Sequence, residues 1–148
     1  MASMNELSKH ILAVGSDNEL PVTNLQLQKV MFFAIGMHIR MNGIDDLVTD
    51  TYDIPFKKWK YGPVIESIYY KYNIYKKEDL TKYTKGTYSE QYKNWDTLII
   101  NLLKQDPFKL VRVSHDMPSW KDYEKEIINL LPVDSYTLDE IAEDFSDE

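Results

Sequence analysis

The feature that most constrains the fold is an apolar helical pattern that begins at residue 24. Thr23 and Gln26 have the spacing of a capping box, which satisfies two backbone N–H groups at a helix start. An i, i+3, i+4 stripe follows, made of Leu27, Val30, Met31, Ala34, Met37, His38 and Met41. The other side is apolar too, with Phe32, Phe33, Ile35 and Ile39. Residues 24–42 therefore predict a central helix, covered on more than one face and ended by Gly43.

Three further capping-box patterns predict helices elsewhere in the chain. Ser3–Glu6, Thr87–Glu90 and Thr137–Glu140 each pair a hydroxyl with a carboxylate three residues later, ahead of apolar residues at helical spacing. The second of these helices runs to about residue 105, where Asp106-Pro107 predicts its end. In the last helix we expect Ile141 and Phe145 to anchor the core.

Gly62-Pro63 predicts another helix start, because proline at the first helical position loses no hydrogen bond. Trp59 and Tyr61 would then pack just before that helix as a hydrophobic staple. Thr51–Phe56 predicts a short extended piece, which Pro55 restricts to a sheet edge or to no sheet. Phe108–Ser114 fits a short helix or a strand equally well, and residues 73–87 read as a polar connection.

The length of 148 residues fits one domain, residues 1–148. We predict a mainly α domain of about six short-to-medium helices around the central one, with one minor extended segment. The chain has no cysteine, which excludes disulfides and thiolate metal sites and suits the cytoplasm. The longest apolar run, Val30 to Ile35, is too short to cross a bilayer, so no membrane contact is expected. Met4 offers a second start, which leaves open whether residues 1–3 are native.

Charge is segregated along the chain. The net charge is −7, yet residues 57–93 hold nine lysines against four acids. Residues 134–148, the acidic C-terminal tail, hold seven acids and no base. The lysine-rich part could meet phosphate, an acidic partner or the chain's own tail, or both parts could simply be solvated faces.

No catalytic, metal or cofactor site is predicted. The three histidines, at positions 10, 38 and 115, have no metal-ligand spacing, and the five glycines stand singly, without a phosphate-binding loop. His38 is expected to be a packed imidazole that bonds through one ring nitrogen. Ser114-His115-Asp116 places three suggestive residue types in a row, but a catalytic triad needs side chains that converge from separate directions. We therefore do not expect an enzyme.

Lysines and tyrosines alternate between residues 57 and 92, where eight of the eleven tyrosines lie. Such a surface can stack nucleic-acid bases. However, the chain has only two arginines. Because arginine is the residue best suited to recognise bases and phosphates, we do not expect nucleic acid to be the main partner. Exposed tyrosines suit a protein interface equally well.

Three motifs in order resemble a known family. Leu27 to Ala34, followed by Gly36, reads LQKVMFFA and resembles the LQKLLYFAQGW helix of the Panacea domain, also called the SocA-like or phage-associated GepA-like antitoxin domain. Residues 59–64 read WKYGPV, as in that family, and residues 114–120 read SHDMPSW, similar to its THxxxPW. With the amphipathic segment 141–145, the resemblance covers residues 23–145. Met37 stands where the family usually has Trp, and residues 82–96 and the acidic tail depart from its pattern.

The resemblance implies a small, mostly helical, non-enzymatic protein, often encoded beside a toxin on prophages and mobile elements, that neutralises its partner by binding. In one branch the antitoxin acts as a proteolytic adaptor, delivering the toxin to a AAA+ protease. We therefore predict an antitoxin-like protein that binds a cognate toxin or effector, with a AAA+ protease as a further partner. The alternative is a nucleic-acid-binding regulator of a phage or mobile element.

The predicted partner-binding residues come from WKYGPV, from SHDMPSW and from residues 73–92, which we call the lysine-tyrosine segment. They are Trp59, Tyr61, Tyr75, Lys76, Lys77, Tyr83, Tyr88, Tyr92, His115 and Trp120. The lysine-tyrosine segment and the acidic tail are the preferred interface. For the motif residues the alternative is a scaffold role, in which Trp120 folds His115 against the body of the domain.

Overall fold

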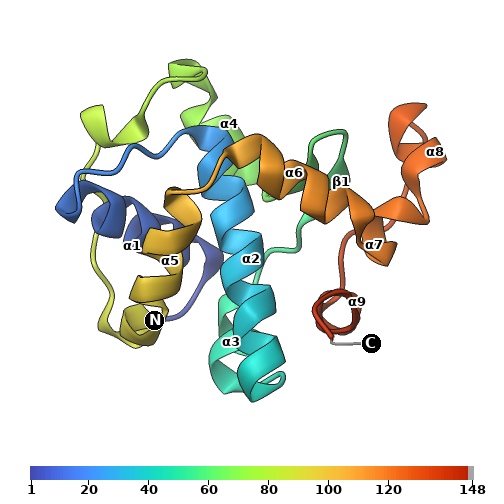
Figure 1. The fold of residues 1–148 in the computed structure, drawn as a ribbon, viewed down its shortest axis with the longest axis horizontal. Helices are drawn as coiled ribbons and strands as arrows, with labels where there is room; N and C mark the ends of the chain where they lie inside the picture. The colour runs from blue at the N-terminus through green and yellow to red at the C-terminus, as the bar shows by residue number, and fades with distance from the viewer. Residues whose placement is uncertain (147–148) are drawn as a thin grey trace.

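The computed structural model describes residues 1–146 and confirms a mainly α single domain with a minor two-stranded sheet (Figure 1). Its α-helices are α1 (Met4–Asp17), α2 (Asn24–Asn42), α3 (Asp46–Thr51), α4 (Glu66–Tyr72), α5 (Asp96–Leu103), α6 (Pro107–Asp116), α7 (Pro118–Lys121), α8 (Glu124–Ile128) and α9 (Leu138–Asp144). Three 3-10 helices, η1 (Asn73–Tyr75), η2 (Leu80–Lys82) and η3 (Glu90–Trp95), and strands β1 (Lys57–Trp59) and β2 (Gly62–Val64) complete it.

Helix α2 is the central element, as its sequence predicts. The capping box forms, since Thr23 Oγ1 accepts from the Gln26 N–H at 3.2 Å and Gln26 Oε1 accepts from the Thr23 N–H at 2.8 Å. Gly43 ends the helix with a backbone φ of +78°, a conformation that glycine adopts without strain. Helices α1, α5, α6 and α9 and strand β2 all contact α2, which runs through the middle of the molecule in Figure 1. Its apolar side chains from Leu27 to Ile35 are therefore enclosed from several directions, whereas Met41, which the predicted stripe includes, is 75% exposed.

The C-terminal stretch closes this core. Tyr136, Ile141 and Phe145 are buried, and the predicted capping box of α9 forms between Thr137 and Glu140. At Gly36 the helix α2 meets the Phe145 ring so closely that a Cβ atom would lie 2.2 Å from it. Much of the acidic tail is thus part of the folded domain, while its last two acids, at positions 147 and 148, lie outside the described residues.

The prediction of a helix start at Gly62-Pro63 is wrong. These residues begin strand β2, which pairs antiparallel with β1 in the register Lys57–Val64 and Trp59–Gly62. Gly62 has a φ of +100°, a turn conformation that lies outside the helical region. Helix α4 begins only at Glu66, so Trp59 and Tyr61 belong to a hairpin rather than to a helix staple.

Other boundaries also differ from the sequence-based expectations. The extended piece expected over Thr51–Phe56 forms no strand, since Thr51 ends helix α3, which Asp45 caps, and β1 begins only at Lys57. The box at Thr87–Glu90 does not form, because the Thr87 N–H, which the Glu90 side chain would accept, donates to the Lys9 carbonyl at 3.1 Å, and a 3-10 helix begins at Glu90. Asp106-Pro107 ends α5 as predicted and also starts α6, since Asp106 caps the Phe108 N–H. Residues 108–114 are therefore helical.

Between residues 1 and 146, no helix combines the length and the apolar character that crossing a membrane would need.

Candidate partner-binding groove

The three motif segments, distant in sequence, meet at one junction. Lys29 Nζ donates to the Pro63 carbonyl at 2.8 Å, which ties α2 to the hairpin. On the other side of the junction, Trp120 Nε1 donates to the Trp59 carbonyl, also at 2.8 Å. A Cβ atom on Gly62 would lie 2.7 Å from Ser114 Oγ, so only glycine fits between the hairpin and α6. The motif residues thus hold the hairpin in place.

His115 and Trp120 form a stacked pair with ring centroids 3.7 Å apart and an interplanar angle of 10°. Trp120 is buried, with 2% of its surface exposed, while His115 is partly exposed. Burial lowers the pKa of the His115 imidazole, and the nearby Lys29 lowers it further. The expected folding of His115 against the domain by Trp120 matches this geometry. Trp120 itself offers no surface to a partner.

Lys29 is the most unusual ionisable group at the junction. Its side chain is fully buried, and this burial lowers the pKa of the amine from 10.5 to about 7. A buried, partly neutral lysine is often catalytic, but a catalytic lysine must reach a substrate. Lys29 has no exposed surface, so we assign it to the scaffold.

Lys29 makes stability depend on pH. Because its pKa is lowered on folding, the unfolded chain binds one more proton between pH 7 and pH 10.5, and stability must rise with pH across that window. We expect the free energy of unfolding to increase by about 2 kcal/mol between about pH 7 and pH 9. Urea titrations at several pH values measure this slope. Lys29→Met should remove it, whereas Lys60→Met, at an exposed lysine, should leave it intact.

A groove of about 620 Å³ opens beside the junction. The hairpin contributes Trp59 and Tyr61, the stretch after η1 contributes Lys76 and Lys77, and α6 contributes Phe108. Leu25, Val64 and Tyr69 are among the other residues of the wall. Tyr61 and Phe108 are 55% and 54% exposed, although both are large and apolar. The volume lies within the range of about 300–1,000 Å³ typical of binding pockets.

The charged residues of the groove favour a negatively charged partner segment. Two lysines line it, and none of the groove residues, all within the described chain, is acidic. Aromatic rings at the mouth supply rigid apolar contact area at low entropic cost. The arrangement fits an apolar protein segment that carries a carboxylate.

Only some of the ten predicted partner-binding residues line the groove. Four of them, Trp59, Tyr61, Lys76 and Lys77, come together in the groove. Phe108 and Tyr69 line it as well, although neither was among the predicted residues, and residues 108–114 fitted a helix or a strand equally well.

The remaining tyrosines lie outside the groove. Tyr75 and Tyr83 stack on each other, with centroids 4.1 Å apart, and Tyr88 donates to Asp96. Tyr92 is a correction, because it is fully buried and its hydroxyl lies 2.8 Å from Thr51 Oγ1. Its ring belongs to the core and is closed to a partner.

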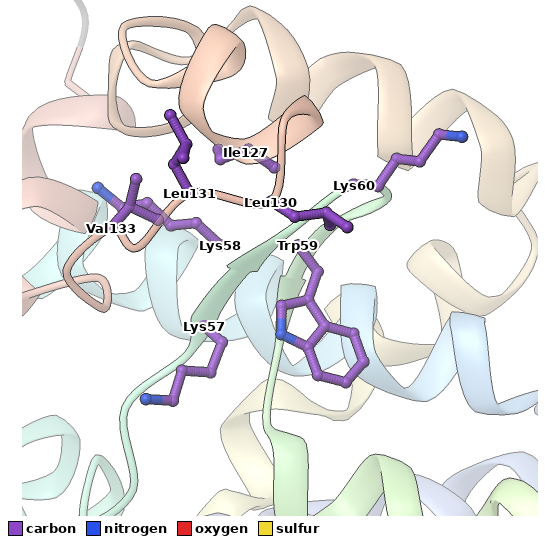
Figure 2. A pocket seen from close by; sticks show the side chains of 8 residues that line it. All are labelled: Lys57, Lys58, Trp59, Lys60, Ile127, Leu130, Leu131 and Val133. Atoms are coloured by element: carbon purple, nitrogen blue, oxygen red, sulfur yellow. The ribbon is translucent and has the colours of Figure 1, made fainter.

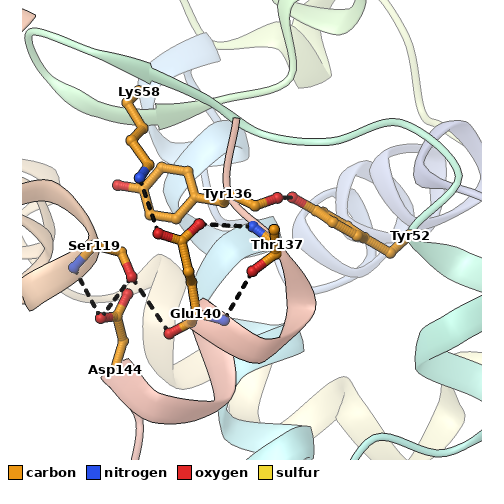
Figure 3. Close-up of polar contacts among 7 residues, drawn as sticks. All are labelled: Tyr52, Lys58, Ser119, Tyr136, Thr137, Glu140 and Asp144. Carbon is orange, nitrogen blue, oxygen red and sulfur yellow. Dashed lines mark hydrogen bonds and ion pairs between the residues drawn. The ribbon is translucent and has the colours of Figure 1, made fainter. Parts of the chain in front are cut away.

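One contact joins the lysine-rich part of the chain to the acidic tail (Figure 3). Lys58 Nζ lies 3.1 Å from Glu140 Oε2 and 4.0 Å from the centroid of the Tyr123 ring. Only 1% of the Lys58 side chain is exposed. Nearby, Asp144 accepts hydrogen bonds from the Ser119 backbone and hydroxyl, and burial raises its pKa. The sequence left open whether the lysines meet phosphate, an acidic partner, the chain's own tail or only water. At Lys58 the contact is with the chain's own tail.

His38 and His10 are engaged in polar contacts, whereas the buried Nε2 of His115 has no hydrogen-bond partner among the described residues. His38 uses both ring nitrogens rather than the one expected, since Nε2 lies 2.8 Å from Asp45 and Nδ1 accepts from Trp95 Nε1 at 3.0 Å. Buried His10 similarly lies 2.7 Å from Asp96. Within residues 1–146, no group of three potential ligands is arranged to hold a metal ion. Ser114 Oγ donates to the Val111 carbonyl, so it is not aligned with a base.

Comparison with protein-family models, curated proteins and solved structures finds no match. The family resemblance therefore rests on the three motifs alone.

Proposed function

We propose that this protein neutralises a cognate toxin or effector by direct binding, with the groove as its contact surface. The observation that carries the proposal is the groove itself, which exposes Tyr61 and Phe108 beside two lysines. Aromatic side chains such as these are enriched in protein interfaces and in their hot spots. The resemblance of the motifs to the Panacea family supports the same function.

The partner segment follows from the chemistry of the walls. An apolar side chain would enter between Tyr61 and Phe108, and a carboxylate on the same segment would pair with Lys76 or Lys77. Binding of this kind requires no catalytic residue. It can block a toxin directly or hold it for a protease, and both outcomes depend on the same contact.

Co-expression with the product of each adjacent gene tests the function. We expect one neighbour to arrest growth when expressed alone, and this protein to restore growth and to co-purify with it. Tyr61→Ala/Phe108→Ala should abolish both effects while leaving the fold intact, because the two side chains are exposed. Absence of rescue and of a complex with every neighbour would contradict the proposal.

A DNA-retention experiment with the purified protein distinguishes this function from nucleic-acid binding. A DNA-binding protein would be retained on DNA at physiological salt and lost when exposed lysines of the hairpin are reversed. Lys57→Glu/Lys60→Glu is the suitable variant, because Lys58 is buried against Glu140 and its reversal would disturb the fold. We expect no salt-sensitive retention on DNA by the unmodified protein.

A further inference from the structure

The end of α8 and the stretch that follows it, residues 127–133, expose apolar side chains outside the groove (Figure 2). Ile128, Leu130 and Leu131 are 53%, 90% and 55% exposed. We call residues 127–133 the leucine segment. Contiguous exposed apolar side chains of this kind mark interaction surfaces.

The backbone holds Leu130 outward at a cost. The Leu130 N–H donates to the Ile127 carbonyl at 3.1 Å, and the Leu131 N–H donates to the Glu126 carbonyl at 2.9 Å. This pair of bonds is the Schellman motif, whose left-handed position usually holds glycine. Leu130 occupies that position with a φ of +58°, although leucine is strained there. Neither burial nor backbone preference within the monomer accounts for a leucine at this site.

Opposite charges flank the leucine segment. On one side it forms, with the hairpin, a hollow of about 420 Å³ lined by the exposed Lys57 and Lys60 and by Lys58, whose charge is already paired with Glu140. On the other side a hollow of about 500 Å³ is lined by Asp122, Glu126 and Asp134. Val133 lines both hollows, so the leucine segment borders each of them. Neither hollow holds a charge of the opposite sign among the described residues that line it.

We propose that the leucine segment is the contact surface of a symmetric dimer, with a second copy of this chain as its occupant. A two-fold axis along the segment packs the two apolar stretches together and places the lysine hollow of each copy over the acidic hollow of the other. A uniformly acidic or basic partner would meet repulsion on one side, whereas a second copy meets attraction on both. This inference goes beyond the proposed function and does not depend on it.

Leu130→Gly separates binding from folding. Glycine removes the backbone strain and loses no buried surface of the monomer, so the unfolding midpoint at low concentration should rise by about 2–4 °C. Dimerisation, measured by sedimentation equilibrium over a concentration series, should weaken at least about 100-fold, because each of the two copies loses a leucine from the apolar contact. A wild-type chain that stays monomeric throughout, or a Leu130→Gly chain that dimerises as well as wild type, overturns the proposal.

A charge swap tests the arrangement of the two copies. The basic hollow is reversed in one protein, Lys57→Glu/Lys60→Glu, and the acidic hollow in the other, Asp122→Lys/Asp134→Lys; all four residues are exposed. Each variant alone should be monomeric, because like charges then face each other across the axis. Their equimolar mixture should form a heterodimer as tight as the wild-type dimer. A mixture that stays monomeric while wild type dimerises would overturn the two-fold arrangement.

Discussion

Replacing Phe32 with alanine is expected to lower the free energy of unfolding by about 3–5 kcal/mol. Phe32 is fully buried in α2, and its ring centroid lies 5.3–5.6 Å from those of Phe33, Phe56, Tyr136 and Phe145. The substitution removes the ring from an aromatic cluster that joins α2 to Phe56, just before β1, and to Tyr136 and Phe145 in the C-terminal stretch. Urea denaturation followed by circular dichroism measures the change.

Phe108→Ala is the matched control, because it removes the same side chain from an exposed position of α6. Its effect on the free energy of unfolding should stay within about 0.5 kcal/mol. Equal effects of the two substitutions would mean that α2 is not the enclosed centre of the fold.

Glu140→Gln is expected to have the second-largest effect, a loss of about 2–3 kcal/mol in the free energy of unfolding. Glutamine keeps an oxygen that can accept from the Thr137 N–H, so the capping box survives. Lys58, however, loses its carboxylate partner while its side chain stays 1% exposed. The loss is smaller than that for a fully buried pair, because Glu140 is 30% exposed and the Tyr123 ring still faces the ammonium.

Glu143→Gln provides the comparison, since it makes the same change on an exposed residue of α9. Thermal unfolding of the two variants side by side should show a large decrease for position 140 and almost none for position 143. A neutral result at position 140 would show that the acidic tail does not hold the hairpin.

Local signals predicted the elements that local forces determine. The capping box at Thr23 and Gln26 and the apolar pattern after it agree with each other, and α2 begins and ends where they indicate. The last helix was predicted for the same reason, from Thr137 and Glu140.

The prediction of a helix start at Gly62-Pro63 failed because this residue pair is compatible with two local structures. A glycine followed by proline suits a helix start, and it also suits a hairpin in which the glycine has a positive φ. The choice is made by distant residues, since Lys29 bonds to the Pro63 carbonyl and Gln28 accepts from the Ile65 N–H. No pattern within residues 59–70 carries that information.

The candidate site was predictable only in part, for the same physical reason. Exposed aromatic and lysine residues were identified by type, but the groove is formed by segments around residues 25, 60, 76 and 108 that meet only in the folded chain. Tyr92 was misplaced because its sequence neighbours are polar, while its ring fills the space between α1 and α3. Its hydroxyl contacts Thr51 and the Ser3 carbonyl.

The affinity of the purified protein for the proposed toxin or effector partner, measured by calorimetry, tests the central role of the groove most directly. Lys76→Glu/Lys77→Glu reverses the two groove lysines, and Lys85→Glu/Lys93→Glu makes the same charge change at exposed lysines outside it. We predict that the groove variant binds about 10-fold to 100-fold more weakly and that the control binds within a few-fold of wild type. Equal losses in both variants, or no loss in the groove variant, would contradict the account.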